Sequence, residues 1–129
     1  SAASDVYKRQ EQKAANRLTE AERKASVKRA AQMLAEKTAH FAKEMGVTYG
    51  RITIREQKTR WGSCSSAGNL NYNWKLVLMP ERVMDYVVIH ELAHRKEMNH
   101  SARFYAVVAQ QMPDYKVWQS WLKEHGREY

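Results

Sequence analysis

The sequence has little of what several classes of protein require. Its single cysteine, Cys64, has no partner for a disulfide within the chain. This favours a reducing compartment, so we expect a cytoplasmic protein. No run of apolar residues reaches the ~18 that a membrane span needs, because Lys75, Asp85 and His90 interrupt the most apolar windows. We therefore expect no membrane partner.

Proline and glycine are scarce as well, at two and five of 129 residues. With 43% hydrophobic and 28% charged residues, the composition is typical of one ordinary globular domain that buries a core without disulfides. Residues 1–10 begin without methionine and lack the apolar stretch of a signal peptide, and we interpret them as a non-native leader. The predicted domain therefore spans residues 11–129.

Acidic residues are outnumbered by basic ones, 14 to 22, which gives a formal net charge of +8. The excess lies in residues 1–80, since residues 81–129 carry seven of each sign. A basic surface attracts anions, so a nucleic acid or nucleotide is a possible partner. The sequence has no aromatic-basic motif of a known nucleic-acid-binding module, and we interpret most of this charge as a solvated surface.

The hydrophobic pattern predicts a long helix followed by a short strand. Thr19, with Glu22 three residues later, forms a capping box, and apolar residues then recur at helical spacing until Gly46, a natural stop. Ile52 and Ile54 alternate with polar residues, which is typical of a strand. We expect the long helix to be a scaffold with a charged, solvated face.

The rest of the chain is predicted to form a second strand and three helices. The polar, glycine-containing segment 58–69 is expected to be a loop, and the alternation over residues 70–78 predicts a long strand with one buried face. Helices follow from Pro80 to about Glu97, from Ser101 to Pro113 and from Asp114 to Gly126. The predicted fold class is therefore α+β.

The segment HELAH, at 90–94, carries the strongest chemical signal. On a helix, positions i and i+4 share one face, so His90 and His94 are able to direct imidazole nitrogens at one metal ion. Glu91 lies about 100° round the helix, where it reaches a water at the metal as a general base. The alternative is two histidines with no shared role. We disfavour it, because these polar residues are costly to place in such an apolar helix without a partner.

A catalytic zinc usually takes three protein ligands, and His100 is the predicted third. In an unbroken helix, His100 would lie about 9 Å beyond His94 and on another face. We therefore expect the chain to turn after about Glu97, at Asn99, a residue that tolerates left-handed backbone geometry. Ser101 would then cap the next helix. The alternatives for the third ligand are Glu97, His40 and His125.

A site of this kind predicts metal-assisted hydrolysis. Zinc bound there would activate a water for attack on a carbonyl, and Glu91 would take the proton and return it to the leaving amine. A second donor normally stabilises the developing oxyanion. The candidates for that donor are Tyr72, Arg103 and Tyr105.

Four segments carry a resemblance to a known family: RLTEAERK at 17–24, ITIREQKTRWGSCSSAGNLNYNWKLVLMP at 52–80, DYVVIHELAHRKEMNHSARFY at 85–105 and MPDYKVWQSWLKEHG at 112–126. They resemble the YgjP-like metallopeptidases, predicted metal-dependent hydrolases of the zincin class that are related in their motif to SprT-like proteases. The resemblance implies a zincin-like α+β domain with a long N-terminal helix, a small β-sheet, a central HExxH helix and two C-terminal helices.

The resemblance also implies a set of site residues. It implies one zinc ion bound by His90, His94 and His100, with Glu91 as the catalytic base. Because family members usually carry an upstream β-rich segment, we expect this chain to be truncated at its N-terminus.

The loop RWGSCSS, at 60–66, has a functional and a structural interpretation. In the first, Lys58 and Arg60 line the cleft and bind substrate. In the second, Trp61 fills the core and Gly62 makes a tight turn, which we favour for these two residues. Cys64 is interpreted as a small buried thiol rather than as a further metal ligand. The candidate substrate-binding residues are Lys58, Arg60, Tyr72, Arg103 and Tyr105.

The sequence therefore predicts a zinc metallopeptidase that cleaves peptide bonds in a peptide or protein substrate. One alternative is hydrolysis of a nucleotide phosphoanhydride at the same metal, with Arg55, Lys58 and Arg60 holding the phosphates. A second alternative is a noncatalytic, nucleic-acid-associated module with a structural zinc. It ranks third, because three histidines leave the fourth zinc position vacant.

Overall fold

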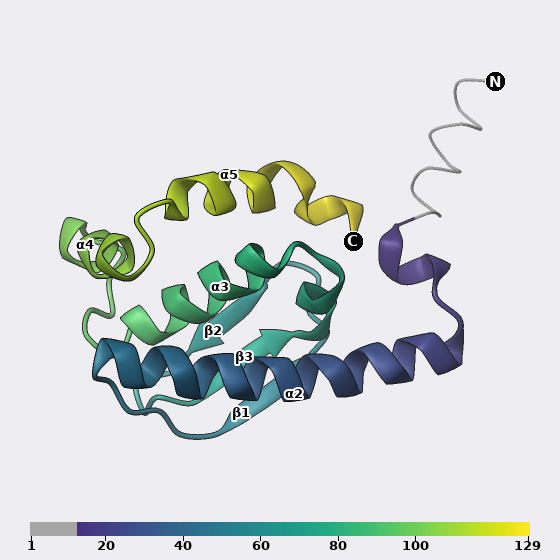
Figure 1. Ribbon diagram of the computed structural model, residues 1–129, viewed down its shortest axis with the longest axis horizontal. Helices are drawn as coiled ribbons and strands as arrows, with labels where there is room; N and C mark the ends of the chain where they lie inside the picture. Colours follow the sequence, from purple (N-terminus) through teal and green to yellow (C-terminus); the bar gives the residue numbers. More distant parts are fainter. Residues whose placement is uncertain (1–12) are drawn as a thin grey trace.

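A computed structural model describes residues 13–129, and the predicted leader, residues 1–10, lies outside the described residues. Helices that precede and follow the strands pack against one side of a small sheet (Figure 1). The helices are α2 (Glu20–Met45), α3 (Glu81–Ala93), α4 (Ala102–Gln111) and α5 (Tyr115–His125), and the strands are β1 (Ile52–Arg55), β2 (Gly62–Cys64) and β3 (Leu70–Asn73). Three short 3-10 helices complete the set: η1 (Ala14–Arg17), η2 (Trp74–Leu78) and η3 (Gly126–Glu128). The predicted α+β fold class is confirmed.

The three strands form one sheet in the order β1-β3-β2. Strand β3 is parallel to β1 and antiparallel to β2, and Tyr72 of β3 lies opposite Ile54 on one side and Gly62 on the other. Both β1 and β2 are therefore edge strands within this sheet.

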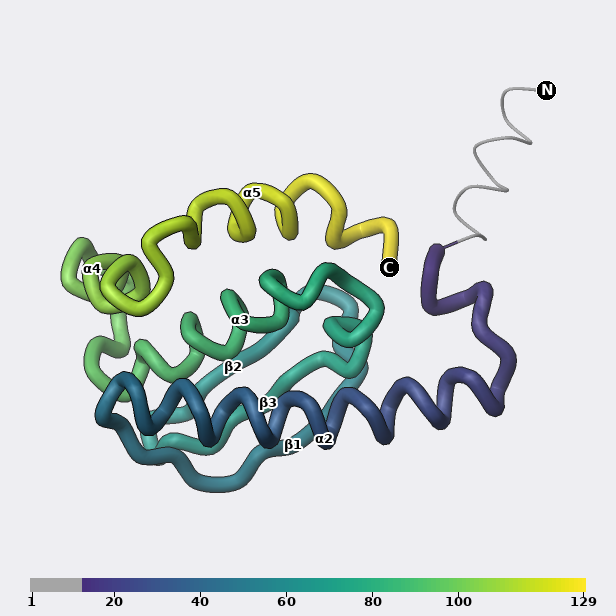
Figure 2. The backbone as a smooth tube through the Cα atoms, viewed as in Figure 1, coloured from purple at the N-terminus to yellow at the C-terminus, as the bar shows by residue number. Residues whose placement is uncertain are grey.

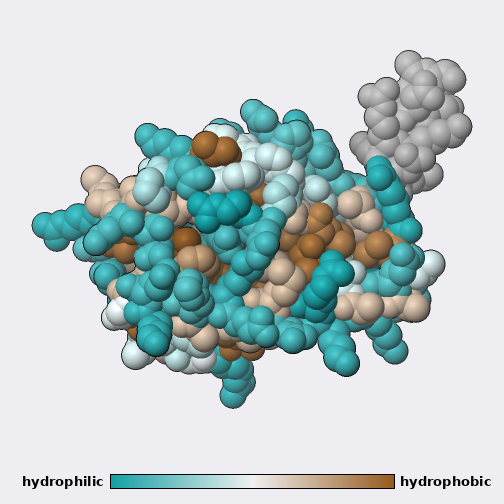
Figure 3. Space-filling model, in the orientation of Figure 1, coloured by the Kyte–Doolittle hydropathy of each residue, from teal (hydrophilic) through white to brown (hydrophobic). Residues whose placement is uncertain are grey.

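Helix α3 is the central helix of the molecule. It contacts α2 on one side and α5 on the other, and it also packs against β2; Figure 2 shows its course between the two outer helices. Ten of its thirteen residues are buried, which explains why its sequence is apolar on almost every face. Hydrophilic side chains cover most of the face shown in Figure 3, and hydrophobic ones are visible between α5 and α2.

Helix α2 begins and ends as the sequence predicts. The hydroxyl of Thr19 accepts from the backbone N–H of Glu22, whose carboxylate accepts from the N–H of Thr19. Gly46 ends the helix with φ 69°, a left-handed conformation that glycine adopts without strain. The hydroxyl of Thr38, on the buried face of α2, lies 3.0 Å from that of Tyr72, so α2 covers one side of the sheet.

The segment between the first strand and α3 differs from the prediction in two places. The predicted loop, residues 58–69, contains strand β2, which pairs with β3. The predicted long strand ends at Asn73 and continues as η2. The side chain of Asn73 explains this end, because its Oδ1 accepts from the N–H of Lys75 at 3.0 Å and thereby starts a turn. Trp74 and Leu76 are buried in η2, so the alternation of buried and less buried residues continues past Asn73 although the backbone is no longer extended.

Helix α3 also ends earlier than predicted, at Ala93 rather than near Glu97. A tight turn over residues 94–96 follows it. Arg95 fixes this turn, since its guanidinium donates to the carbonyl oxygens of Thr48 at 2.8 Å and Ser66 at 3.2 Å. The expected left-handed turn at Asn99 is wrong, because within residues 13–129 only glycines have positive φ. The predicted cap is confirmed: Ser101 accepts from the N–H of Phe104.

Candidate metal centre

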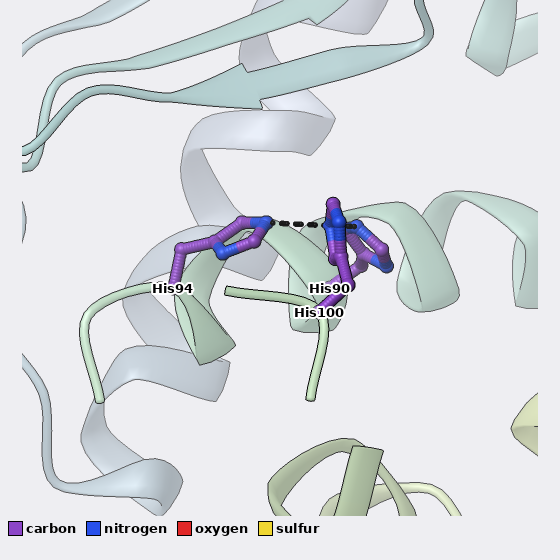
Figure 4. A group of neighbouring side chains, drawn as sticks. All are labelled: His90, His94 and His100. Carbon is purple, nitrogen blue, oxygen red and sulfur yellow. Dashed lines mark hydrogen bonds between the residues drawn. The ribbon is translucent and has the colours of Figure 1, made fainter. Parts of the chain in front are cut away.

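Three histidines converge between the end of α3 and the start of α4. His90 lies in the last turn of α3, His94 is its C-terminal cap, and His100 immediately precedes the Ser101 cap of α4. The Nε2 atom of His100 lies 3.2 Å from Nε2 of His90 and 3.1 Å from Nε2 of His94. The three rings point toward one another (Figure 4). Among residues 13–129, these three form the group of side chains able to share one metal ion.

The separations of the His100 nitrogen from those of His90 and His94 suit a tetrahedral metal ion. For ligands about 2.0–2.1 Å from a zinc ion, tetrahedral angles place neighbouring nitrogens about 3.3–3.4 Å apart, close to the distances found here. The tautomer of His94 also fits, because its Nδ1 lies 3.1 Å from the carbonyl oxygen of Glu97 and must donate to it. The Nε2 atom of His94 therefore presents a lone pair to the common point.

The surroundings keep the imidazoles of His90 and His94 uncharged. Burial, reinforced by the neighbouring His94 and His100, lowers the pKa of His90 to about 4. Burial likewise lowers the pKa of His94. At neutral pH these rings are therefore neutral and able to bind a cation through a lone pair.

A single aromatic ring supports all three histidines. The centroid of the Phe104 ring lies 4.5 Å from that of His94, 4.8 Å from that of His90 and 5.0 Å from that of His100. Phe104 is fully buried, at 0% exposure. The sequence predicts Phe104 only as part of the apolar side of a helix, and its role under the histidines was missed. A second missed contact is that of Tyr86, whose hydroxyl lies 3.3 Å from Nδ1 of His90, one turn earlier on α3.

Glu91 occupies a buried position beside the histidines. It is 6% exposed, and burial raises its pKa to about 8, against the opposing charge of Arg60. Strand β2 approaches its side chain closely: a Cβ atom on Gly62 would lie 3.1 Å from both Cγ and Oε2 of Glu91. A glycine at this position thus leaves the room that the carboxylate occupies.

The three histidines and Glu91 line one cavity of about 410 Å³, a size suited to a small ligand or a segment of peptide. Besides the histidines and Cys64, its ionisable side chains are those of Glu91 and Arg60. The cavity is lined by Arg60, Gly62, Ser63, Cys64, His90, Glu91, His94, Met98 and His100.

The alternatives for the third ligand lie elsewhere. Glu97 contributes its backbone carbonyl, which accepts from His94. His40 lies beside Glu44 on α2, and His125 lies beside Glu128 at the end of α5. Cys64 lines the cavity but is outside the group of metal-binding side chains. The structure therefore brings His100 to the HELAH pair, as the sequence predicts.

The candidate substrate-binding residues are only partly brought together. Arg60 lines the cavity, whereas Lys58 is exposed outside it. Tyr72 is 1% exposed and its hydroxyl contacts Thr38 in the core, so the structure does not bring it to the cavity.

The two candidate substrate-binding residues on α4, Arg103 and Tyr105, do not line the metal-centre cavity either. Arg103 is exposed to solvent. Tyr105 is half-buried, with its ring stacked on Tyr115 at 5.8 Å and tilted against His100 at 6.4 Å. Of this pair, Tyr105 is the residue near the histidines.

The structural interpretation of the loop RWGSCSS holds in part for Trp61 and is wrong for Gly62, which lies in strand β2 rather than in a tight turn. Trp61 is half-buried against the core, and a Cβ atom on Gly126 would lie 3.1 Å from its ring. Cys64 is half-buried, and burial together with the charge of Glu91 raises the pKa of its thiol. A thiol in this state is poorly ionised at neutral pH.

Comparisons with known proteins find similarity to metallopeptidases. Residues 2–125 match the model of the family described as YgjP-like, metallopeptidase domain. The metallopeptidase zymogen of Pyrococcus abyssi abylysin is similar in structure, with a TM-score of 0.63 and 23% sequence identity over 70% of this chain and 93% of that chain. The metallopeptidase zymogen of Methanocaldococcus jannaschii jannalysin has a TM-score of 0.54 and 19% identity, over 65% of this chain and 90% of that one.

At these identities the two structures establish a likeness of fold, and both contain a metallopeptidase. Comparison with curated proteins gave no match. Among residues 13–129, no helix has both the length and the apolar character needed to cross a membrane.

Proposed function

Because the chain belongs to the YgjP-like metallopeptidase family, we propose that it is a zinc-dependent peptidase that cleaves peptide bonds in a peptide or protein substrate. We assign His90, His94 and His100 as the zinc ligands and Glu91 as the general base. The observation that carries this proposal is the convergence of three imidazole nitrogens beside a buried carboxylate, in a cavity large enough for a segment of peptide.

The donor set favours zinc. Three imidazoles are a common ligand set of catalytic zinc, and they would leave a position for water or substrate. Zinc bound there would act as a Lewis acid that polarises the substrate carbonyl and activates water. Phe104 packs against all three rings, and the carbonyl of Glu97 orients the ring of His94.

Glu91 moves the proton. Its carboxylate takes a proton from the attacking water and returns it to the nitrogen of the leaving amine. Gly62 leaves space for this side chain, and the absence of any ion pair to Glu91 within residues 13–129 keeps both oxygens available. Arg60, in the wall of the same cavity, is the residue that we propose to contact the substrate.

The alternative substrate, a nucleotide phosphoanhydride, has weaker support. It requires Arg55, Lys58 and Arg60 to converge on phosphates, but Arg60 is the member of this set that lines the cavity. The guanidinium of Arg55 instead donates to Asn71 at 2.7 Å on the sheet. We also propose a cytoplasmic location, on the ground that the chain has a single cysteine.

The experiment compares the wild type with Glu91→Gln after both are loaded with zinc. We measure bound zinc and the cleavage of unfolded proteins and of a nucleotide panel. Glu91→Gln removes the base and no ligand, so it should keep its zinc and lose hydrolysis by about 10²–10⁴-fold. Unchanged turnover of the variant would refute the role of Glu91, and turnover of nucleotides alone would refute the peptidase.

A further inference from the structure

The side of the sheet that faces away from α2 is polar and basic. Side chains alternate along a strand, and the hydroxyl of Tyr72 meets Thr38 of α2, which assigns Tyr72 to the covered side. Its neighbour Asn71 therefore faces the opposite side, together with Thr53, its partner in β1. Arg51 and Arg55 lie two residues on either side of Thr53, so they share this face.

This side of the sheet has a cavity of its own. Its volume is about 510 Å³, and it is lined by Arg51, Thr53, Arg55, Asn69, Leu70 and Asn71. The lining holds two positive charges and no carboxylate. Within residues 13–129, neither guanidinium forms an ion pair, whereas Arg23, Lys37 and Arg82 all do.

Asn71 orients one of the two arginines. Its Oδ1 accepts from Nε of Arg55 at 2.7 Å. This contact uses one of the five N–H donors of the guanidinium and leaves the terminal pair, whose fork matches a carboxylate. The arginine is thus held over the sheet with its charge available to a ligand.

The same hydrogen-bonded row leads to the metal-centre cavity. Thr53, Asn71 and Ser63 are register partners across the three strands. Nδ2 of Asn71 donates to Oγ of Ser63 at 3.1 Å, and Ser63 lines the cavity that holds the three histidines. Two interstrand spacings of about 4.8 Å separate β1 from β2, a distance of about 10 Å, which three residues of extended peptide span.

We propose that this basic face, made of Arg51, Thr53, Arg55 and Asn71, is a second binding site for an acidic stretch of the polypeptide substrate. The stretch lies about three or more residues from the bond that is cleaved. The proposal rests on the proposed peptidase function. Charge complementarity supports an acidic partner, and the lining holds none of the aromatic side chains on which the bases of a single-stranded nucleic acid stack.

Binding is tested first on the metal-free protein. The probes are a fluorescent peptide with a run of glutamates, a neutral peptide of equal length, and an oligothymidylate of the same charge as the acidic peptide. The variant Arg51→Gln/Arg55→Gln should bind the acidic peptide about tenfold more weakly than the wild type. The matched control, Lys28→Gln/Arg29→Gln on the exposed side of α2, should bind it as the wild type does.

Cleavage is tested next on the zinc-loaded protein, with a neutral peptide and the same peptide extended by glutamates. The Arg51→Gln/Arg55→Gln variant should raise KM about tenfold for the extended peptide and leave the neutral peptide unchanged. Equal effects of the variant and its control, or no preference of the wild type for the acidic extension, would overturn the second site while leaving the peptidase intact.

Two further outcomes separate the proposals. Binding of the acidic peptide through Arg51 and Arg55, with no cleavage of any peptide, would support the second site and refute the peptidase. Tighter, arginine-dependent binding of the oligothymidylate than of the acidic peptide would overturn the acidic-peptide assignment in favour of a nucleic-acid surface.

Discussion

Replacing Phe104 with leucine tests how the metal centre is held. The Phe104 ring lies within 5.0 Å, centroid to centroid, of the rings of His90, His94 and His100, so a smaller side chain removes the surface against which all three pack. Because Phe104 is 0% exposed, we expect a loss of about 1–2 kcal/mol in the free energy of unfolding of the metal-free protein.

The same substitution should weaken zinc binding about tenfold. Groups that orient metal ligands typically contribute 10–100-fold to metal affinity. Because Phe104 acts by packing and donates no hydrogen bond to the histidines, we expect an effect at the lower end of this range. The assay is competition for zinc with a chromophoric chelator, alongside urea unfolding of the metal-free protein. The control is Val108→Ala, one turn further along α4 and also 0% exposed. Equal zinc affinity of the two variants at matched stability would refute this reasoning.

Three further predictions follow from contacts elsewhere. Gly62→Ala places a Cβ atom 3.1 Å from the side chain of Glu91, so we expect a severalfold lower kcat with full zinc content; an unchanged kcat would contradict this close approach. A hydrogen bond from Trp74 lowers the pKa of Glu56 below its ordinary 4.5. The ionised carboxylate therefore stabilises the folded protein above pH 4.5, and this stabilisation is lost as the pH falls through the pKa of Glu56 in the folded protein. Between about pH 5 and pH 3, the free energy of unfolding should therefore fall less for Glu56→Gln than for the wild type, as measured by urea unfolding followed by tryptophan fluorescence. An equal fall in both proteins would contradict this role of Glu56. Thr19→Ala removes the helix cap and should cost about 1 kcal/mol without changing zinc affinity, as chelator competition would show.

The helical parts of the site could be predicted because their causes are local in sequence. The spacing of His90 and His94 fixes their relation on any helix. The cap at Ser101 predicts a new helix start and so places His100 at a bend, which the structure bears out. The exact route of that bend could not be predicted, because Arg95 anchors it to the carbonyls of Thr48 and Ser66, residues far away in the sequence.

Features that depend on distant partners were missed. Strand β2 has three residues, Gly62–Cys64, and its extended form rests on pairing with β3 rather than on its own polar sequence. The contact of Phe104 with three histidines likewise needs the packing of α4 on α3. Tyr72 is a different case. In the alternating pattern over residues 70–78, Tyr72 lies on the same buried face as Leu70, so the sequence itself argued against a role for Tyr72 in the cavity.

The zinc content of the wild type and of His100→Ala, measured by mass spectrometry after dialysis, tests the central claim most directly. His40→Ala, which alters an exposed histidine on α2, is the control, and circular dichroism verifies that all three proteins are folded. We predict one zinc per chain in the wild type and in His40→Ala, and loss of bound zinc in His100→Ala. Full retention of zinc by a folded His100→Ala protein would contradict the three-histidine site.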